Sequence, residues 1–77
     1  MSNSQRLFSA ARARAVADRE TAISTLEVYF DKSVGIGEHA DLATEIDKYV
    51  DLLATANDRI DALDCYSDTI AESSETG

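Results

Sequence analysis

The sequence predicts an all-α protein, an antiparallel two-helix hairpin, on three observations. The chain of 77 residues has no proline and only three glycines, two of which stand close together at Gly35 and Gly37. Apolar residues recur at helical spacing on both sides of this glycine pair. A single cysteine excludes an internal disulfide, so a core this small needs another source of stability. We therefore expect a helix at about 4–31, a turn at 32–39 and a helix at about 40–72, forming one domain (1–77) that assembles into a dimeric four-helix bundle.

The first helix is predicted from a cluster of N-cap residue types, Ser2-Asn3-Ser4, followed by good helix formers. Its apolar bulk increases towards residue 30. Arg12 and Arg19 share heptad phase with Leu26, so the basic half cannot be an ordinary leucine seam. The main apolar positions and those alongside them are Val16, Ile23, Leu26 and Phe30, with Phe8, Ala15, Ala22 and Tyr29.

The turn is predicted from the stretch DKSVGIGEH at 31–39, where two glycines permit positive φ. Val34 and Ile36 alternate with these glycines. We expect both side chains to fold inward and close the end of the hairpin.

The second helix carries a regular heptad seam from Leu42 to Ile70, weakened at Ser67. Val50 and Leu52 widen it on opposite sides, so this helix could contact more than one neighbour. The polar tail at 73–77 is expected to fray. Because helix 4–31 cannot cover the seam throughout, we interpret the seam as half of an interface whose remainder comes from another chain. The predicted interface residues are Leu42, Ile46, Tyr49, Leu53, Ala56, Ile60, Leu63 and Ile70.

Pairing across the hairpin is predicted from the two helix ends that flank the turn. Residues 31 and 40 as pivots give residue numbers that sum to roughly 71 across an antiparallel pair. This register brings the basic start of the first helix beside the acidic end of the second. The predicted pairs are Arg19 with Asp51, Arg14 with Asp58, and Arg6 with Asp64 and Asp68.

Charge is distributed unevenly along the chain. The net charge of −8 arises from +2 over residues 1–20 and −10 over residues 21–77. This balance argues against direct contact with nucleic acid or an anionic membrane. The N-terminus lacks the apolar core of a signal peptide, and no apolar run approaches a bilayer span. We expect a cytoplasmic protein.

Few residues suggest chemistry, and each has a structural interpretation that we favour. Glu38, His39 and Asp41 combine metal-ligand types, but one histidine with two carboxylates better suits helix capping. The Gly-x-Gly turn lacks the strand and lysine of a phosphate-binding loop. Cys65 occupies an outward heptad position beside acids, where a thiol is not activated. Three tyrosines are predicted to pack against the helices rather than to stack on nucleic-acid bases: Tyr29, Tyr49 and Tyr66. We assign no catalytic, cofactor-binding or metal-binding residue.

The stretch at 25–63, with VGIGEHAD followed by an acidic amphipathic helix, resembles small uncharacterised proteins of tailed marine bacteriophages, especially those infecting cyanobacteria. Ala40 departs from that family, where proline is frequent, and this leaves the start of the second helix open. The resemblance implies a viral origin, and with it the host cytoplasm and a host protein partner. It transfers no functional residue.

These observations favour a small non-enzymatic interaction protein that self-associates as a homodimer. A second hypothesis is an acidic DNA mimic that inhibits a nucleic-acid-binding protein. It rests on an acidic series that otherwise serves only solubility. A third, least favoured, is a metal-binding protein built around His39. The acidic series comprises Asp47, Asp51, Asp58, Asp61, Asp64 and Asp68.

Overall fold

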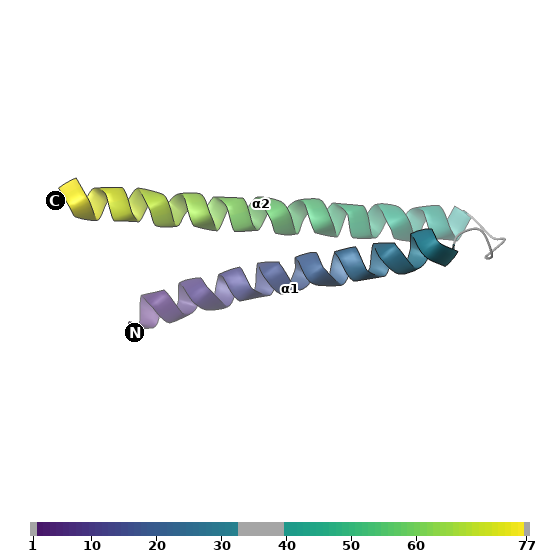
Figure 1. Ribbon diagram of the computed structural model, residues 1–77, viewed down its shortest axis with the longest axis horizontal. Helices are drawn as coiled ribbons and strands as arrows, with labels where there is room; N and C mark the ends of the chain where they lie inside the picture. Colours follow the sequence, from purple (N-terminus) through teal and green to yellow (C-terminus); the bar gives the residue numbers. More distant parts are fainter. Residues whose placement is uncertain (1, 33–39, 77) are drawn as a thin grey trace.

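The computed structural model is an antiparallel hairpin of two helices, α1 (Asn3–Lys32) and α2 (Ala40–Thr76). It describes residues 2–32 and 40–76, and the side chains of 2–31 and 41–69. The molecule is a rod 61 Å long, 20 Å wide and 16 Å thick. Both termini lie at one end of the rod, and the helices diverge towards that end (Figure 1). The all-α hairpin predicted from the sequence is confirmed.

The start of α1 is fixed by a capping box between Ser2 and Gln5. The Gln5 N–H donates to Ser2 Oγ at 3.1 Å, and the Ser2 N–H donates to Gln5 Oε1 at 3.0 Å. The Arg6 N–H also donates to the Ser2 carbonyl at 3.1 Å. This reciprocal pattern satisfies backbone donors that have no partner within the helix. Ser2 is therefore the N-cap, and α1 begins one residue before the predicted start at about residue 4.

The end of α2 lies at Thr76, beyond the predicted end at about residue 72. No proline or glycine precedes Gly77 in this segment, so no residue there opposes continued helical geometry. Residues 73–76 belong to α2, and fraying of the tail at 73–77 stays a prediction. The inward packing predicted for Val34 and Ile36 concerns residues outside the described ranges.

The core of the hairpin is small and rich in alanine. Small side chains at a helix–helix contact allow the two backbones to approach closely. The stripe that faces α2 is therefore the one through Ala15 and Ala22, whereas Ile23 and Phe30, on the stripe predicted as the main apolar one, keep 37% and 59% exposure. The buried core residues, with their exposed fractions, are Ala15 (1%), Ala22 (0%), Leu26 (7%), Ala56 (0%) and Ile60 (6%).

The register of the hairpin differs from the prediction. Residue numbers across the observed contacts sum to 74–78 rather than roughly 71. The prediction used only the helix ends beside the turn, whereas side-chain packing along the whole rod sets the register. In the described part of the chain, ion pairs therefore join other partners than the predicted ones. These pairs are Arg12–Asp64 and Asp18–Arg59 between the helices, and Arg19–Glu20 within α1.

Candidate interaction surface

The seam predicted on α2 faces α1 along its centre and remains partly exposed along its length. Ala56 and Ile60 are buried between the helices. Ser67, where the seam was expected to weaken, is exposed, and the side chain of Ile70 is not described. The remaining seam residues are half-buried: Leu42, Ile46, Tyr49, Leu53 and Leu63.

The strongest polar contact between the helices joins Arg12 to Asp64. Arg12 Nε donates to Asp64 Oδ1 at 2.8 Å, and Nη2 donates to Oδ2 at 3.0 Å. This two-point geometry matches the planar guanidinium to the carboxylate. The hydrogen bond from Arg12 holds the pKa of Asp64 below its ordinary value of 3.8. Desolvation of the carboxylate opposes this shift, and the positive charge of Arg12 adds to it. The same contact raises the pKa of Arg12.

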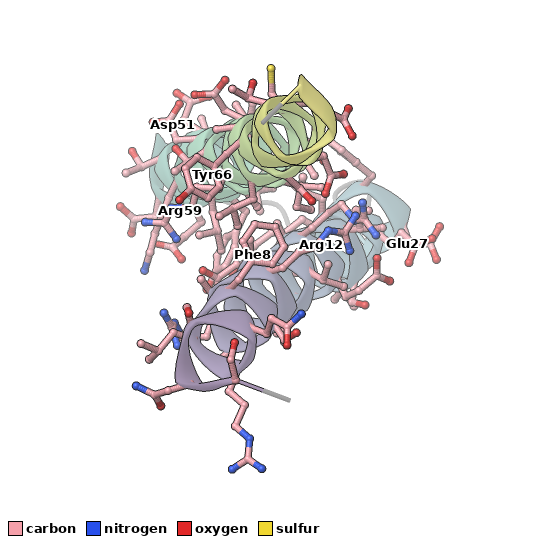
Figure 2. The ribbon with its side chains drawn as sticks, turned by 90° about the vertical axis from the view of Figure 1, so that its left-hand side faces the viewer. Phe8, Arg12, Glu27, Asp51, Arg59 and Tyr66 are labelled. Atoms are coloured by element: carbon pink, nitrogen blue, oxygen red, sulfur yellow. The ribbon has the colours of Figure 1, made fainter. Side chains whose placement is uncertain are left out.

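This pair links two stripes of residues on one side of the hairpin. On α1, positions 12, 16, 19, 23, 26 and 30 repeat at spacings of four and three, so they share one side of the helix. On α2, positions 46, 50, 53, 57, 60 and 64 do the same. Because Arg12 contacts Asp64, both stripes lie on the same side of the rod. Figure 2 shows Arg12 and Glu27 on this side and Arg59, Tyr66 and Asp51 on the other.

We call the apolar members of these stripes the apolar strip. Ile23 keeps 37% exposure and Val50 keeps 45%, whereas Leu26 and Ile60 are almost fully buried. Exposed and half-buried apolar side chains that adjoin one another are typical of a surface that binds a partner. The strip consists of Val16, Ile23, Leu26, Phe30, Ile46, Val50, Leu53 and Ile60.

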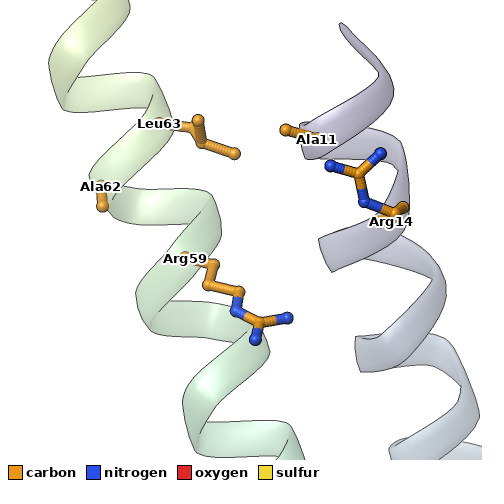
Figure 3. A pocket seen from close by; sticks show the side chains of 5 residues that line it. All are labelled: Ala11, Arg14, Arg59, Ala62 and Leu63. Atoms are coloured by element: carbon orange, nitrogen blue, oxygen red, sulfur yellow. The ribbon is translucent and has the colours of Figure 1, made fainter. Parts of the chain in front are cut away.

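The opposite side of the hairpin is more polar and contains an open groove. Its volume is about 470 Å³, and its apolar wall includes Ala11 and Leu63 (Figure 3). Arg14 and Arg59 line the same groove from the two helices. Arg59 Nη1 also donates to Asp18 Oδ2 at 3.3 Å, an exposed contact of small energetic value.

Aromatic pairs join the helices towards both ends of the rod. Phe8 and Tyr66 stack with ring centroids 6.4 Å apart, where α1 and α2 diverge. Near the other end, Tyr29 and Tyr49 lie 6.1 Å apart at an interplanar angle of 50°. Burial, together with the negative charge of Glu45, raises the pKa of the Tyr29 phenol. These tyrosines pack against aromatic neighbours, as the sequence predicted for Tyr29 and Tyr49.

An acidic ridge runs along α2 at heptad positions b and f, away from α1. Over its length of about 32 Å it holds five exposed aspartates, whereas duplex DNA of that length carries about 19 phosphate charges. The ridge therefore has a much lower negative charge per unit length than a nucleic acid. Cys65 lies at an f position beside it, and its thiol is free and exposed. The ridge residues are Asp47, Asp51, Asp58, Asp61 and Asp68.

The remaining candidate sites fall largely outside the described residues. Glu38, His39 and the Gly-x-Gly turn lie within 33–39, and Asp41 is exposed in the first turn of α2. Across residues 2–32 and 40–76, no three potential ligands gather at one place to hold a metal ion. Within the same ranges, neither helix combines the length and apolar character needed to cross a membrane.

Sequence reasoning missed that α1 contacts α2 mainly through Ala15 and Ala22, whereas the strip lies on the adjoining side of α1, where it shares only Leu26 with the buried core. The heptad repeat of alanine at 15 and 22 was the available signal, because a bulky stripe beside a small one leaves the small one to make the close contact. No protein-family model, no curated protein and no solved structure matches this chain.

Proposed function

We propose that this chain is a small, non-enzymatic protein–protein interaction module that self-associates through the apolar strip. The observation that supports it is the exposure of Ile23 and Val50, two large apolar side chains on one side of the hairpin. Within the described residues, the core that holds the hairpin together comprises five buried side chains, three of them alanine. A partner on the strip would add the apolar burial that this core lacks.

Several large apolar side chains of the strip are only partly removed from water. Full burial of a valine, leucine or isoleucine side chain contributes about 1.5–3 kcal/mol relative to exposure. Val16, Ile46 and Leu53 are half-buried beside the two more exposed residues, so each has part of this contribution still to gain. A second copy carries the same strip, and a two-fold contact would cover both strips at once.

Sedimentation equilibrium at micromolar concentrations tests this proposal. We expect the parent chain to sediment as a dimer and Ile23→Glu to sediment as a monomer, because the charge would be buried in the contact. Val28→Glu is the matched control, since Val28 is 52% exposed and lies five residues along α1, away from the strip. A parent chain that remains monomeric, with a cooperative melt by circular dichroism, would refute self-association.

The alternative proposal, an acidic mimic of nucleic acid, is supported by the acidic ridge. The dilute charge of the ridge relative to DNA places this function second. A host protein as a further partner is supported only by the resemblance to bacteriophage proteins. Capture of host proteins on the immobilised chain, washed with rising salt, tests both. Retention of a basic partner at low salt and its release at high salt would favour the mimic, and retention of none would exclude it.

A further inference from the structure

Building on the self-association proposed above, we infer that two copies pack strip to strip with their Lys32/Ala40 ends together. In this arrangement the two-fold axis runs along the rod, and α1 of each copy lies against α2 of the other. The four helices then form a bundle in which the two copies of α2 are diagonal to one another. The occupant of the strip is thus a second copy of this chain in one defined orientation.

The opposite net charges of the two helices carry this inference. Helix α1 contains five basic and four acidic residues, for a net charge of +1. Helix α2 contains two basic and ten acidic residues, for a net charge of −8. Any arrangement that places α2 beside α2 therefore brings two strongly negative helices together. An arrangement that alternates α1 and α2 around the bundle separates them.

The rival two-fold arrangement has its axis across the rod and places the Lys32/Ala40 ends at opposite ends of the bundle. Its α2 helices become direct neighbours, at an interaxial distance of about 9 Å. In the inferred arrangement the two α2 helices are diagonal to one another, about 13 Å apart. With a screening length of about 8 Å, the repulsion between two charges at this distance is about 0.4 of the repulsion at about 9 Å. Both arrangements bury the same strips, so this difference selects between them.

The strip also keeps its register in the inferred arrangement. Rotation about the rod axis does not change the position of a residue along the rod. Ile23 lies at the same height as Leu53 within its own hairpin, so it meets Leu53 of the second copy. Leu26 likewise meets Val50 of the second copy. Arg19, which forms an ion pair with its sequence neighbour Glu20 at 3.3 Å, comes to the level of Asn57 of the second copy, the residue before Asp58.

The available area fits a dimer of moderate affinity. The stripe that holds the strip on α1 runs from residue 12 to residue 30, about 27 Å at the helical rise. With the 20 Å width of the rod, the flat footprint is about 540 Å² per copy, near the lower limit for a specific interface. Interfaces near this limit are typical of reversible association rather than of a permanent dimer.

Distances between spin labels test the orientation. Cysteine is introduced at Ala10 or at Ser24, both exposed and outside the strip, in a Cys65→Ser background that removes the exposed native thiol. With the axis along the rod, a label has no axial separation from its copy, so both positions should give similar short distances. With the axis across the rod near residue 22, the axial separation is about 36 Å at Ala10 and about 6 Å at Ser24.

Similar distances at the two positions would support the inference. A distance at Ala10 that exceeds the distance at Ser24 by about 20 Å or more would overturn it, while self-association would stand. Sedimentation of the labelled proteins identifies the other failure, because a monomer gives no distance and refutes the proposed function itself. The Ile23→Glu variant carrying the same labels should lose both distances.

Discussion

Replacement of Ala22 by leucine is the most direct test of the close contact between the helices. Ala22 has no exposed surface, and Ala56 on the facing helix has none either. A leucine at this position adds three carbon atoms where no space exists, so the helices must separate or the side chain must take a strained rotamer.

Overpacking of this kind costs about 1–3 kcal/mol. A chain of this length has a free energy of unfolding of about 4–12 kcal/mol, and a core of five buried side chains suggests the lower part of that range. The substitution should therefore remove a quarter or more of the total stability. For a domain of this size the melting temperature should fall by about 4–24 °C.

Thermal melts followed by circular dichroism at 222 nm measure this change, at several protein concentrations to separate folding from association. Ala54→Leu is the matched control, because Ala54 is exposed on the same rod and leucine is also a good helix former there. The control should shift stability by no more than about 0.5 kcal/mol. An Ala22→Leu protein as stable as the control would contradict the close contact.

Two further predictions follow from pKa values. The hydrogen bond from Arg12 lowers the pKa of Asp64, so this carboxylate stabilises the fold above pH 3.8 and loses that effect as pH falls through its folded-state pKa. The Asp64→Asn protein should therefore melt at a lower temperature than the parent at pH 7. Its melting temperature should also change less than that of the parent between pH 5 and pH 2. Equal changes in both proteins would show that Asp64 contributes nothing to acid sensitivity. Burial raises the pKa of Tyr29, so the neutral phenol stabilises the fold below pH 10 and this effect is lost as pH rises through its folded-state pKa. Urea denaturation between pH 9 and pH 11 should therefore show a smaller loss for Tyr29→Phe than for the parent, and an identical loss would contradict the assignment to Tyr29.

The hairpin itself could be predicted from the sequence, because helix propensity, the glycine pair and heptad spacing act locally. Ser2 and Gln5 even carry the capping-box pattern that fixes the start of α1. The face of α1 that contacts α2 was harder to predict. Ile23 and Phe30 have the larger apolar area, but Ala15 and Ala22 permit the closer approach, and the balance between them depends on the facing residue Ala56.

The register of the two helices could not be predicted from local sequence patterns either, because it depends on side-chain packing between the helices. Pairing from the helix ends predicted Arg19 beside Asp51, a difference of several residues from the observed level. Packing at Phe8–Tyr66 and at Tyr29–Tyr49 joins side chains that are 58 and 20 residues apart in the sequence, so it lies outside any local pattern. The ion pairs then form where this packing brings opposite charges together.

The small residues at the centre of the rod also determine how far the two helices can slide past one another. Asp61 and Asp68 lie about one helical turn on either side of Asp64, so a shift of α2 by one turn, about 5.4 Å, would still bring an aspartate of the acidic ridge to the level of Arg12. The same shift would replace Ala56 opposite α1 by a bulky neighbour such as Leu53 or Ile60. Charge alone therefore tolerates several alignments, and it is the absence of side-chain volume at Ala56 that selects one of them.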